Sequence, residues 1–169
     1  MSATPPVKLD ATDRKLLLLL SQDGRRGGSD LARVLGLSRQ AVAERIRDLE
    51  RRGVVRGYRA DIDAALLGLG VRAQIRLTLD SKAGGKGEKD VLKRLGGHPM
   101  VRSVHRVSGE DCFVVQLVCR RIEDVTLVLA ELQKSRAIQS SRTAFVLETL
   151  VEKDGFGPIV EALLPGEGR

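Results

Sequence analysis

The sequence predicts an α+β protein in two parts, and three observations lead to this expectation. Residues 9–53 carry apolar side chains at helical spacing, interrupted by glycine. Residues 71–151 instead mix segments of strand period with segments of helix period. Residues 1–60 hold 13 Lys and Arg against 7 Asp and Glu, whereas residues 61–169 hold 16 against 15. We therefore expect a helical domain at 1–60, a hinge at 61–70, a mixed domain at 71–153 and a tail at 154–169.

The composition narrows the class of protein. With 169 residues, 42% hydrophobic and 30% charged, the chain is typical of one or two globular domains. Three Phe, one Tyr and no Trp count against binding single strands by base stacking. The longest apolar run, residues 16–20, is far shorter than the roughly 20 residues of a membrane span. No secretory signal precedes residue 10, so we expect a cytoplasmic protein without membrane contact.

Two helices are expected before residue 37. Asp10 is a good N-cap for the first, and Asp13 places negative charge in its first turn. Gly24 ends this helix after a wide leucine face. The second helix runs from residue 28 or 29 to residue 35, and Gly36 suits the left-handed position that follows a helix.

A third helix is expected over residues 39–52, capped by Ser38 and ended by Gly53. Val42, Ile46 and Leu49 form one apolar stripe along it. A short helix, a tight turn and a Ser-capped helix are together typical of a helix-turn-helix, whose second helix enters the DNA major groove. A three-helix bundle with a merely charged exterior is the alternative.

The face opposite the apolar stripe supplies the candidate DNA-binding residues. Arg39 and Gln40 have side chains that pair with guanine and adenine edges, and Ala43 is small enough to approach a thymine methyl. Ser38 and the helix N-terminus suit a phosphate. Glu44 could accept from cytosine or pair with a neighbouring side chain such as Arg47. The helix also carries arginines suited to phosphate contacts or local ion pairs, namely Arg45, Arg47, Arg51 and Arg52.

A small wing is expected at residues 54–60, where Gly57 permits a bend between extended pieces. Arg56 and Arg59 would contact the DNA backbone from it, and Tyr58 would pack against the domain. The first domain is therefore predicted to be a winged helix-turn-helix that binds double-stranded DNA.

The second domain is expected to contain four strands and two helices in the order βαββαβ, which is the ferredoxin-like arrangement. In chain order the segments are strand 71–79, loop 81–87, helix 88–95, strand 101–108, turn 109–111, strand 112–119, helix 122–133 and a strand within 137–151. Both helices would cover one face of an antiparallel sheet. Two short helices cannot hide all of the apolar residues of this domain, so the other face would stay partly apolar and imply self-association. The residues concerned are Val101, Val104, Val107, Val115, Leu117, Phe145, Leu147 and Leu150.

The histidines and cysteines do not predict a metal site. His98, His105, Cys112 and Cys119 recur every seven residues, but glycines and Pro99 interrupt any helix that would align them. We expect His98 to cap a turn and both cysteines to be small buried or half-buried side chains. No nucleophile–base pair or phosphate loop is visible, so no cofactor and no enzyme activity are expected.

A series of short motifs runs along the chain, namely Leu9-Asp10-x-x-Asp13, Asp23-Gly24-Arg25, Asp30-Leu31-Ala32, Leu35-Gly36-Leu37-Ser38, Arg45-Ile46-x-x-Leu49-Glu50, Gly53-Val54-Val55, Gly57-Tyr58, Gly109-x-Asp111 and Arg142-Thr143-x-x-Val146-Leu147. In these motifs the chain resembles the leucine-responsive regulatory protein/AsnC (feast/famine) family of transcriptional regulators. Gly27-Gly28 departs from it, because the family usually has a capping Ser or Thr there, and Ser29 is the nearest substitute.

This resemblance implies a homodimer formed through the sheets, with dimers assembling as far as an octamer. It also implies an amino-acid effector bound near the turn between the second and third strands, at Gly109, Glu110, Asp111 and Thr143. The family's aromatic residue after the Asp is replaced here by Cys112. Two alternatives remain open: an architectural, nucleoid-like DNA binder without an effector, and a sirohaem decarboxylase-like enzyme. The tail, at residues 156–164, would add an apolar turn that packs on a partner.

Overall fold

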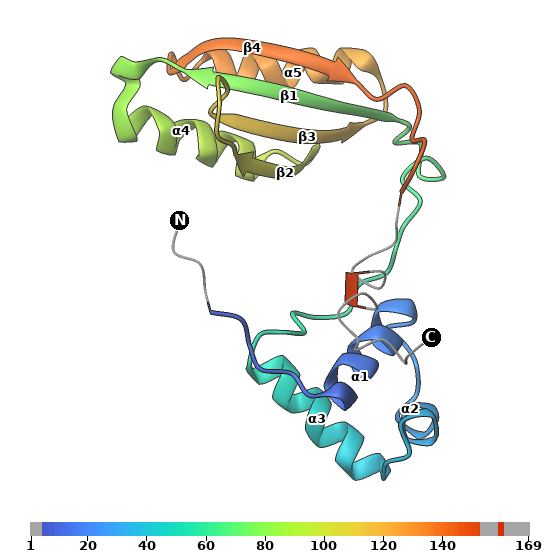
Figure 1. The fold of residues 1–169 in the computed structure, drawn as a ribbon. Helices are drawn as coiled ribbons and strands as arrows, with labels where there is room; N and C mark the ends of the chain where they lie inside the picture. Colours follow the sequence, from blue (N-terminus) through green and yellow to red (C-terminus); the bar gives the residue numbers. More distant parts are fainter. Residues whose placement is uncertain (1–4, 153–158, 161–169) are drawn as a thin grey trace. The chain divides into compact units, whose positions relative to one another are not determined.

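The computed structural model describes residues 5–152 and 159–160. The chain divides into two compact units, with a boundary between residues 61 and 62, and the second unit extends to residue 150 (Figure 1). Each unit is considered by itself below. Of the predicted tail, residues 159 and 160 are described and helical, and the rest of the expected apolar turn lies outside the described residues. Within residues 5–152 and 159–160, no helix combines the length and apolarity that crossing a membrane requires.

The first unit contains the three expected helices, α1 (Ala11–Gln22), α2 (Gly28–Leu35) and α3 (Arg39–Arg51). One apolar core joins them, because each helix buries its hydrophobic side. Four of its fully buried large side chains are Leu16, Leu31, Val42 and Leu49. Each such burial contributes about 1.5–3 kcal/mol relative to exposure, so this small core fixes how each helix is rotated.

The helix ends follow local capping chemistry. The Asp13 N–H donates to Asp10 Oδ1 at 2.6 Å and the Asp10 N–H donates to Asp13 Oδ2 at 3.2 Å, which completes a capping box at the start of α1. Gly36 ends α2 with φ of 66°, as expected. Ser29 does not cap α2, because the helix already begins at Gly28 and Gly27 occupies the cap position without a side-chain hydrogen bond.

Residues 54–60, expected to form a wing of extended pieces, form no strand. The N–H groups of Val54 and Val55 both donate back to the Leu49 carbonyl, at 2.9 and 3.2 Å, and so wrap around the end of α3. Gly57 does bend the chain, with φ of 139°. Tyr58 is 48% exposed and its hydroxyl donates to Glu50 at 3.2 Å, so the segment lies against its own unit as an irregular loop.

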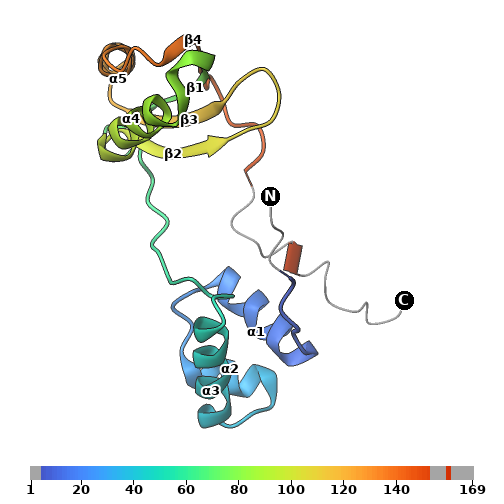
Figure 2. The ribbon, with the colours of Figure 1, turned by 90° about the vertical axis from the view of Figure 1, so that its left-hand side faces the viewer.

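The second unit confirms the βαββαβ order. Its elements are β1 (Val71–Leu79), η1 (Ser81–Ala83), α4 (Gly84–Gly97), β2 (Val101–Arg106), β3 (Phe113–Cys119), α5 (Ile122–Gln133) and β4 (Ile138–Phe145). The strands lie in the order β2-β3-β1-β4, and each pair is antiparallel. Figure 2 shows α4 and α5 on the same side of this sheet.

The expected loop at 81–87 is instead the short η1 and the first turn of α4. Asp80 caps η1 by accepting from the Lys82 N–H at 2.8 Å. A side chain on Gly87 would place its Cβ 2.7 Å from the Ala83 Cβ and 2.9 Å from the Ala137 Cβ. Glycine at this point therefore serves a close approach between α4 and the chain entering β4, and it does not mark a loop.

The open face of the sheet was expected to carry apolar residues, and this prediction is wrong for the strand residues it named. Val115 and Leu117 are buried beneath the helices, opposite the buried Ile75 and Ala73 of β1. Val104 pairs with Val115 and so shares that covered face. The open face is mostly polar and carries Arg72, Gln74, Arg76, Thr78, Ser103, His105, Val114, Gln116, Val118, Ser140, Arg142 and Ala144. Strand alternation shows which residues share a face, but only packing decides which face the helices cover.

Exposed apolar residues occur instead at the end of β4 and after it. This strand, expected within residues 137–151, ends at Phe145, and its register shifts opposite Thr78 and Leu79. Phe145 is 39% exposed, Leu147 97% and Leu150 83%. This segment beside an edge strand is one apolar surface available for self-association, and Ile122 and Leu127 of α5 are also exposed.

Candidate functional site

The start of α3 is fixed by its cap and by its apolar stripe. Ser38 Oγ accepts from the Ala41 N–H at 3.1 Å, and the Ser38 carbonyl accepts from the Val42 N–H at 3.1 Å. Val42 and Leu49 are fully buried and Ile46 packs beside them, as predicted. The helix rotation is thereby set, and the opposite side carries five exposed residues, namely Arg39, Gln40, Ala43, Glu44 and Arg47.

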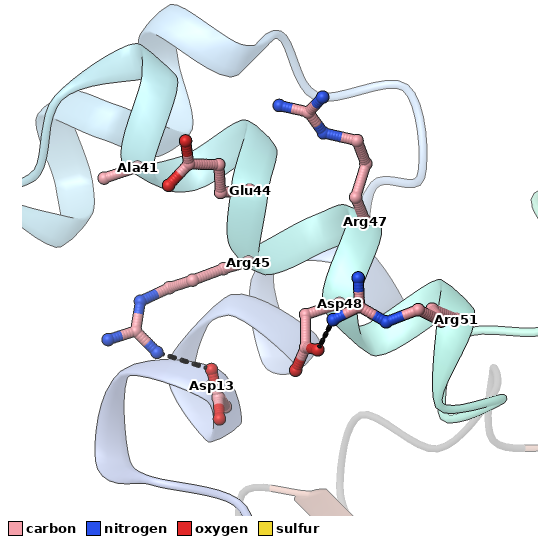
Figure 3. A pocket seen from close by; sticks show the side chains of 7 residues that line it. All are labelled: Asp13, Ala41, Glu44, Arg45, Arg47, Asp48 and Arg51. Carbon is pink, nitrogen blue, oxygen red and sulfur yellow. Dashed lines mark hydrogen bonds and ion pairs between the residues drawn. The ribbon is translucent and has the colours of Figure 1, made fainter.

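The exposed side of α3 is weakly tied to its surroundings. Gln40 Nε2 donates to Glu44 Oε1 at 3.4 Å, so Glu44 pairs with Gln40 rather than with Arg47. Arg47 Nε donates to the carbonyl of Ala43 on its own helix at 3.2 Å. Figure 3 shows the Arg47 guanidinium pointing away from α1. This side therefore presents a guanidinium and a side-chain amide that a hydrogen-bonding partner can engage with little rearrangement.

The other arginines of α3 are held in ion pairs. Arg45 Nη1 donates to Asp10 Oδ2 and to Asp13 Oδ1, both at 2.7 Å. These hydrogen bonds, first the one to Asp10 and then the one to Asp13, raise the pKa of Arg45. Figure 3 shows Arg45 extending across a groove toward Asp13 on α1.

The C-terminal turn of α3 has its own cluster around Asp48. Arg52 Nη1 donates to Asp48 Oδ2 at 2.8 Å, and Arg51 also donates to Asp48. The hydrogen bond from Arg52 is the main reason that the pKa of Asp48 is lowered. Arg52 in addition donates to the carbonyl of Lys8, just before α1. Of the two uses expected for Arg45, Arg51 and Arg52, the structure shows the local ion pair in each case.

Arg56 and Arg59 lie on the irregular segment after α3, and both are exposed. Their positions leave them free to approach a phosphate, although no wing strands support them. The first unit thus gathers Ser38 and the exposed residues of α3 on one side, with these two arginines on an adjoining loop.

The turn between β2 and β3 forms a second candidate site. Gly109 has φ of 117°, which only glycine adopts readily, and it lets the chain reverse. The Cys112 N–H donates to the Leu77 carbonyl at 2.8 Å, and Thr78 Oγ1 donates to the Glu110 carbonyl at 3.4 Å. The turn is therefore fastened to the end of β1.

Arg142 of β4 joins the two carboxylates of this turn. Its Nη2 lies 3.1 Å from Asp111 Oδ1 and 3.5 Å from Glu110 Oε2, and the hydrogen bond to Asp111 is the first cause of the raised pKa of Arg142. The Asp111 side chain is 14% exposed, whereas that of Glu110 is 88% exposed.

Thr143 does not join this group. It pairs with Ile75, whose side chain faces the helices, so it lies on the other face of β4 from Arg142. The structure therefore brings Gly109, Glu110 and Asp111 together with Arg142 instead. Arg142 was not among the predicted site residues. Its charge, opposite to that of the acidic turn, is the one sequence signal that could have indicated it, but the pairing of β4 with β1 is needed to locate the contact.

The histidines and cysteines take structural places. His98 Nδ1 accepts from the Met100 N–H at 3.3 Å, which confirms its expected role in a turn. Cys119 is buried and Cys112 is half-buried, and both are free thiols. Across the part of the chain that the structure describes, no group of three or more His, Cys, Asp or Glu side chains is placed to hold a metal ion.

Each of the two units matches a domain of a known protein family. Residues 9–50 match the AsnC-type helix-turn-helix domain, and residues 72–156 match the Lrp/AsnC ligand binding domain. The chain is 34% identical over 143 residues to the HTH-type transcriptional regulator AldR of Mycolicibacterium smegmatis, covering 84% of this chain and 83% of that protein. It is also 34% identical over 142 residues to a leucine-responsive regulatory protein of Rhizobium meliloti, with coverages of 83% and 90%.

Solved structures give the same result. A transcriptional regulator of Neisseria meningitidis, in complex with L-Met, superposes with a TM-score of 0.81 at 25% identity, covering 90% of this chain and 99% of that one. Escherichia coli AsnC superposes with a TM-score of 0.79 at 26% identity, with coverages of 87% and 97%.

Proposed function

The chain belongs to the Lrp/AsnC family of transcriptional regulators, and from this premise we propose that it binds duplex DNA as a homodimer or larger oligomer through α3. One observation carries the proposal: α3 buries its apolar stripe and leaves Arg39, Gln40 and Arg47 exposed on the other side. The N-terminal half of such a helix fits the major groove. Two copies about 34 Å apart would read a pseudo-palindromic site.

Each residue of this surface has a distinct task in the proposal. Arg39 and Gln40 read base edges, Ala43 permits close approach, and Arg47 contacts a phosphate. Ser38 presents the helix N-terminus to the DNA backbone, while Arg56 and Arg59 add phosphate contacts from the following loop. Glu44, which accepts from Gln40, orients that amide or accepts from cytosine. The protein acts in the cytoplasm as a regulator and not as an enzyme.

The second unit is proposed to bind an amino acid that modulates this activity. A neighbour in structure is a transcriptional regulator in complex with L-Met. In this chain, the carboxylates of Glu110 and Asp111 suit an α-ammonium, and the Arg142 guanidinium suits an α-carboxylate. The backbone of the Gly109 turn adds N–H donors. Thr143, on the other face of β4, remains a candidate only for a ligand that passes the edge of that strand.

Selection of duplexes from a random pool by the full chain tests the proposal. We expect enrichment of a pseudo-palindrome, and binding that weakens steeply with salt because arginines displace counterions from phosphates. Arg39→Ala or Gln40→Ala should relax the base preference at one position of each half-site, whereas Arg56→Ala should weaken selected and random duplexes alike. Tight binding of every duplex without preference would instead favour the architectural, nucleoid-like alternative, and absence of DNA binding would refute the proposal.

A further inference from the structure

Beyond the apolar core that they share, long polar side chains connect α1 to α3. The helix α2 packs closely on both α1 and α3, whereas α1 and α3 make few close backbone approaches to each other. Arg45 extends from the middle of α3 to Asp10 and Asp13 at the start of α1. Arg52, seven residues later on the same side of the helix, reaches the Lys8 carbonyl. The Asp10–Asp13–Arg45 group is called the clamp below.

The two carboxylates of the clamp are oriented before Arg45 reaches them. The capping box holds both, because each accepts a hydrogen bond from the backbone N–H of the other residue. The Asp13 side chain is 10% exposed and that of Arg45 is 34% exposed, so water screens their attraction only in part. Arg45 Nη1 contacts both carboxylates at 2.7 Å, which fixes its position to one point on α1.

We propose that Arg45 is a positioning residue for DNA recognition, and that it sets the angle of α3 through the clamp instead of contacting phosphate. The apolar core sets the rotation of α3 about its own axis, but apolar packing is non-directional and specifies the tilt of the helix less sharply. A charge pair with defined hydrogen bonds selects one arrangement. Because Arg39 and Gln40 lie at the helix end beyond the clamp, a small tilt at residue 45 displaces their side chains from the base edges. This inference rests on the proposed function.

The obvious alternative is that Arg45 leaves Asp10 and Asp13 to contact a DNA phosphate. The two views predict opposite effects for the double variant Asp10→Asn/Asp13→Asn. If Arg45 contacts phosphate, the variant frees the guanidinium and removes two negative charges near the DNA, so binding tightens. If Arg45 acts through the clamp, binding weakens. Asparagine is as good an N-cap as aspartate, so the start of α1 is retained.

The experiment is a fluorescence-anisotropy titration of the full chain at several KCl concentrations, on a selected duplex and on a random duplex of equal length. We expect Arg45→Met and Asp10→Asn/Asp13→Asn each to weaken the selected duplex about tenfold, with the salt slope of the wild type. Combining them should add little further loss, because both remove the same coupling. Arg45→Lys should restore part of the affinity, since one nitrogen makes both contacts.

Arg47→Met is the matched control, because Arg47 lies on the same helix and bonds only to its own turn. Its loss should lower the salt slope by about one. Circular dichroism at the assay temperature checks that each variant is folded. If Arg45→Met does not fold, Asp10→Asn/Asp13→Asn and Arg45→Lys decide the question. A reduced salt slope for Arg45→Met, or tighter binding by Asp10→Asn/Asp13→Asn, overturns the positioning role of Arg45 and leaves the proposed function standing. A wild-type chain that does not prefer the selected duplex overturns the proposed function, and the positioning role with it.

Discussion

Arg45 and Arg47 are two residues apart on α3, yet they have different partners because they lie on different sides of the helix. Arg45 bonds to two carboxylates of α1, whereas Arg47 bonds to a carbonyl of its own helix. Residue type alone made both of them candidates for a phosphate contact. The chemistry of each depends on which carboxylates lie within reach, and Asp10 and Asp13 both pair with Arg45.

The acidic side of the clamp predicts a pH dependence of stability. The pKa of Asp10 lies below its ordinary value of 3.8, first because the Asp13 N–H donates to it, with Arg45 adding to the effect against the cost of burial. A carboxylate whose pKa is lowered by folding stabilises the folded state. Its contribution is complete at pH values above the ordinary pKa and is lost as the pH falls through the lowered pKa. Asp10→Asn, which keeps the cap, should therefore be less stable than wild type at neutral pH and equally stable in strong acid.

The measurement is urea unfolding followed by tyrosine fluorescence. Tyr58 is the chain's one tyrosine, no tryptophan is present, and Tyr58 lies in the first unit, so the signal reports on that unit alone. We expect a difference of up to about 1 kcal/mol at pH 7, because the Asp10 side chain is 52% exposed and screened by water. A difference that stays constant below about pH 3 would contradict the assigned cause.

At the scale of elements, α4 shows how packing overrides a local signal. Its first residues are rich in glycine and lysine, a composition that favours a loop. Helix and neighbouring chain nevertheless approach closely there, and Gly87 is the residue that permits it. Gly85, two residues earlier on the same helix, has open space around it. Glycine is thus required for close packing at residue 87 but not at residue 85.

These two glycines give a matched pair of substitutions. Gly87→Ala should destabilise the second unit by about 1–3 kcal/mol, because its Cβ would lie within 3 Å of two alanine Cβ atoms. Gly85→Ala should be neutral or stabilising by about 0.5 kcal/mol, since alanine favours helix. Thermal unfolding followed by circular dichroism measures both, and Tyr58 fluorescence checks that the first unit is unchanged. Equal effects of the two substitutions would show that the close approach does not matter for stability.

At the scale of the whole molecule, the two units differ in net charge and in exposed apolar surface. The excess of positive charge lies in residues 1–60, whereas residues 61–169 are almost balanced. In the second unit, the balance takes the form of specific pairs such as Arg142 with Asp111 and Arg94 with Glu131. The apolar residues around Leu147 remain exposed in the single chain and offer area for self-association.

A panel of the twenty amino acids tests the proposed role of the second unit. A ligand that binds only the native state at 100 times its Kd adds about 2.7 kcal/mol of stability, so an effector should raise the Tm of the full chain clearly. Asp111→Asn should abolish that rise, because it removes the charge of a half-buried carboxylate proposed to hold the α-ammonium. Glu123→Gln, an exposed change on α5, is the control. If no amino acid shifts the Tm, a regulator without this class of effector is favoured.

The sequence by itself determined the element order, the caps at Asp10 and Ser38, the apolar stripe of α3 and the exposure of the residues opposite it. These depend on periodicity and on hydrogen bonds between near neighbours, which a linear pattern contains. Only the tertiary structure decided that Val115 lies beneath the helices, that Arg142 pairs with Asp111, and that Arg45 of α3 bonds to the carboxylates at the start of α1. The reason is physical: alternation and charge specify which residues need partners, but contacts between residues more than 30 positions apart depend on how the elements pack.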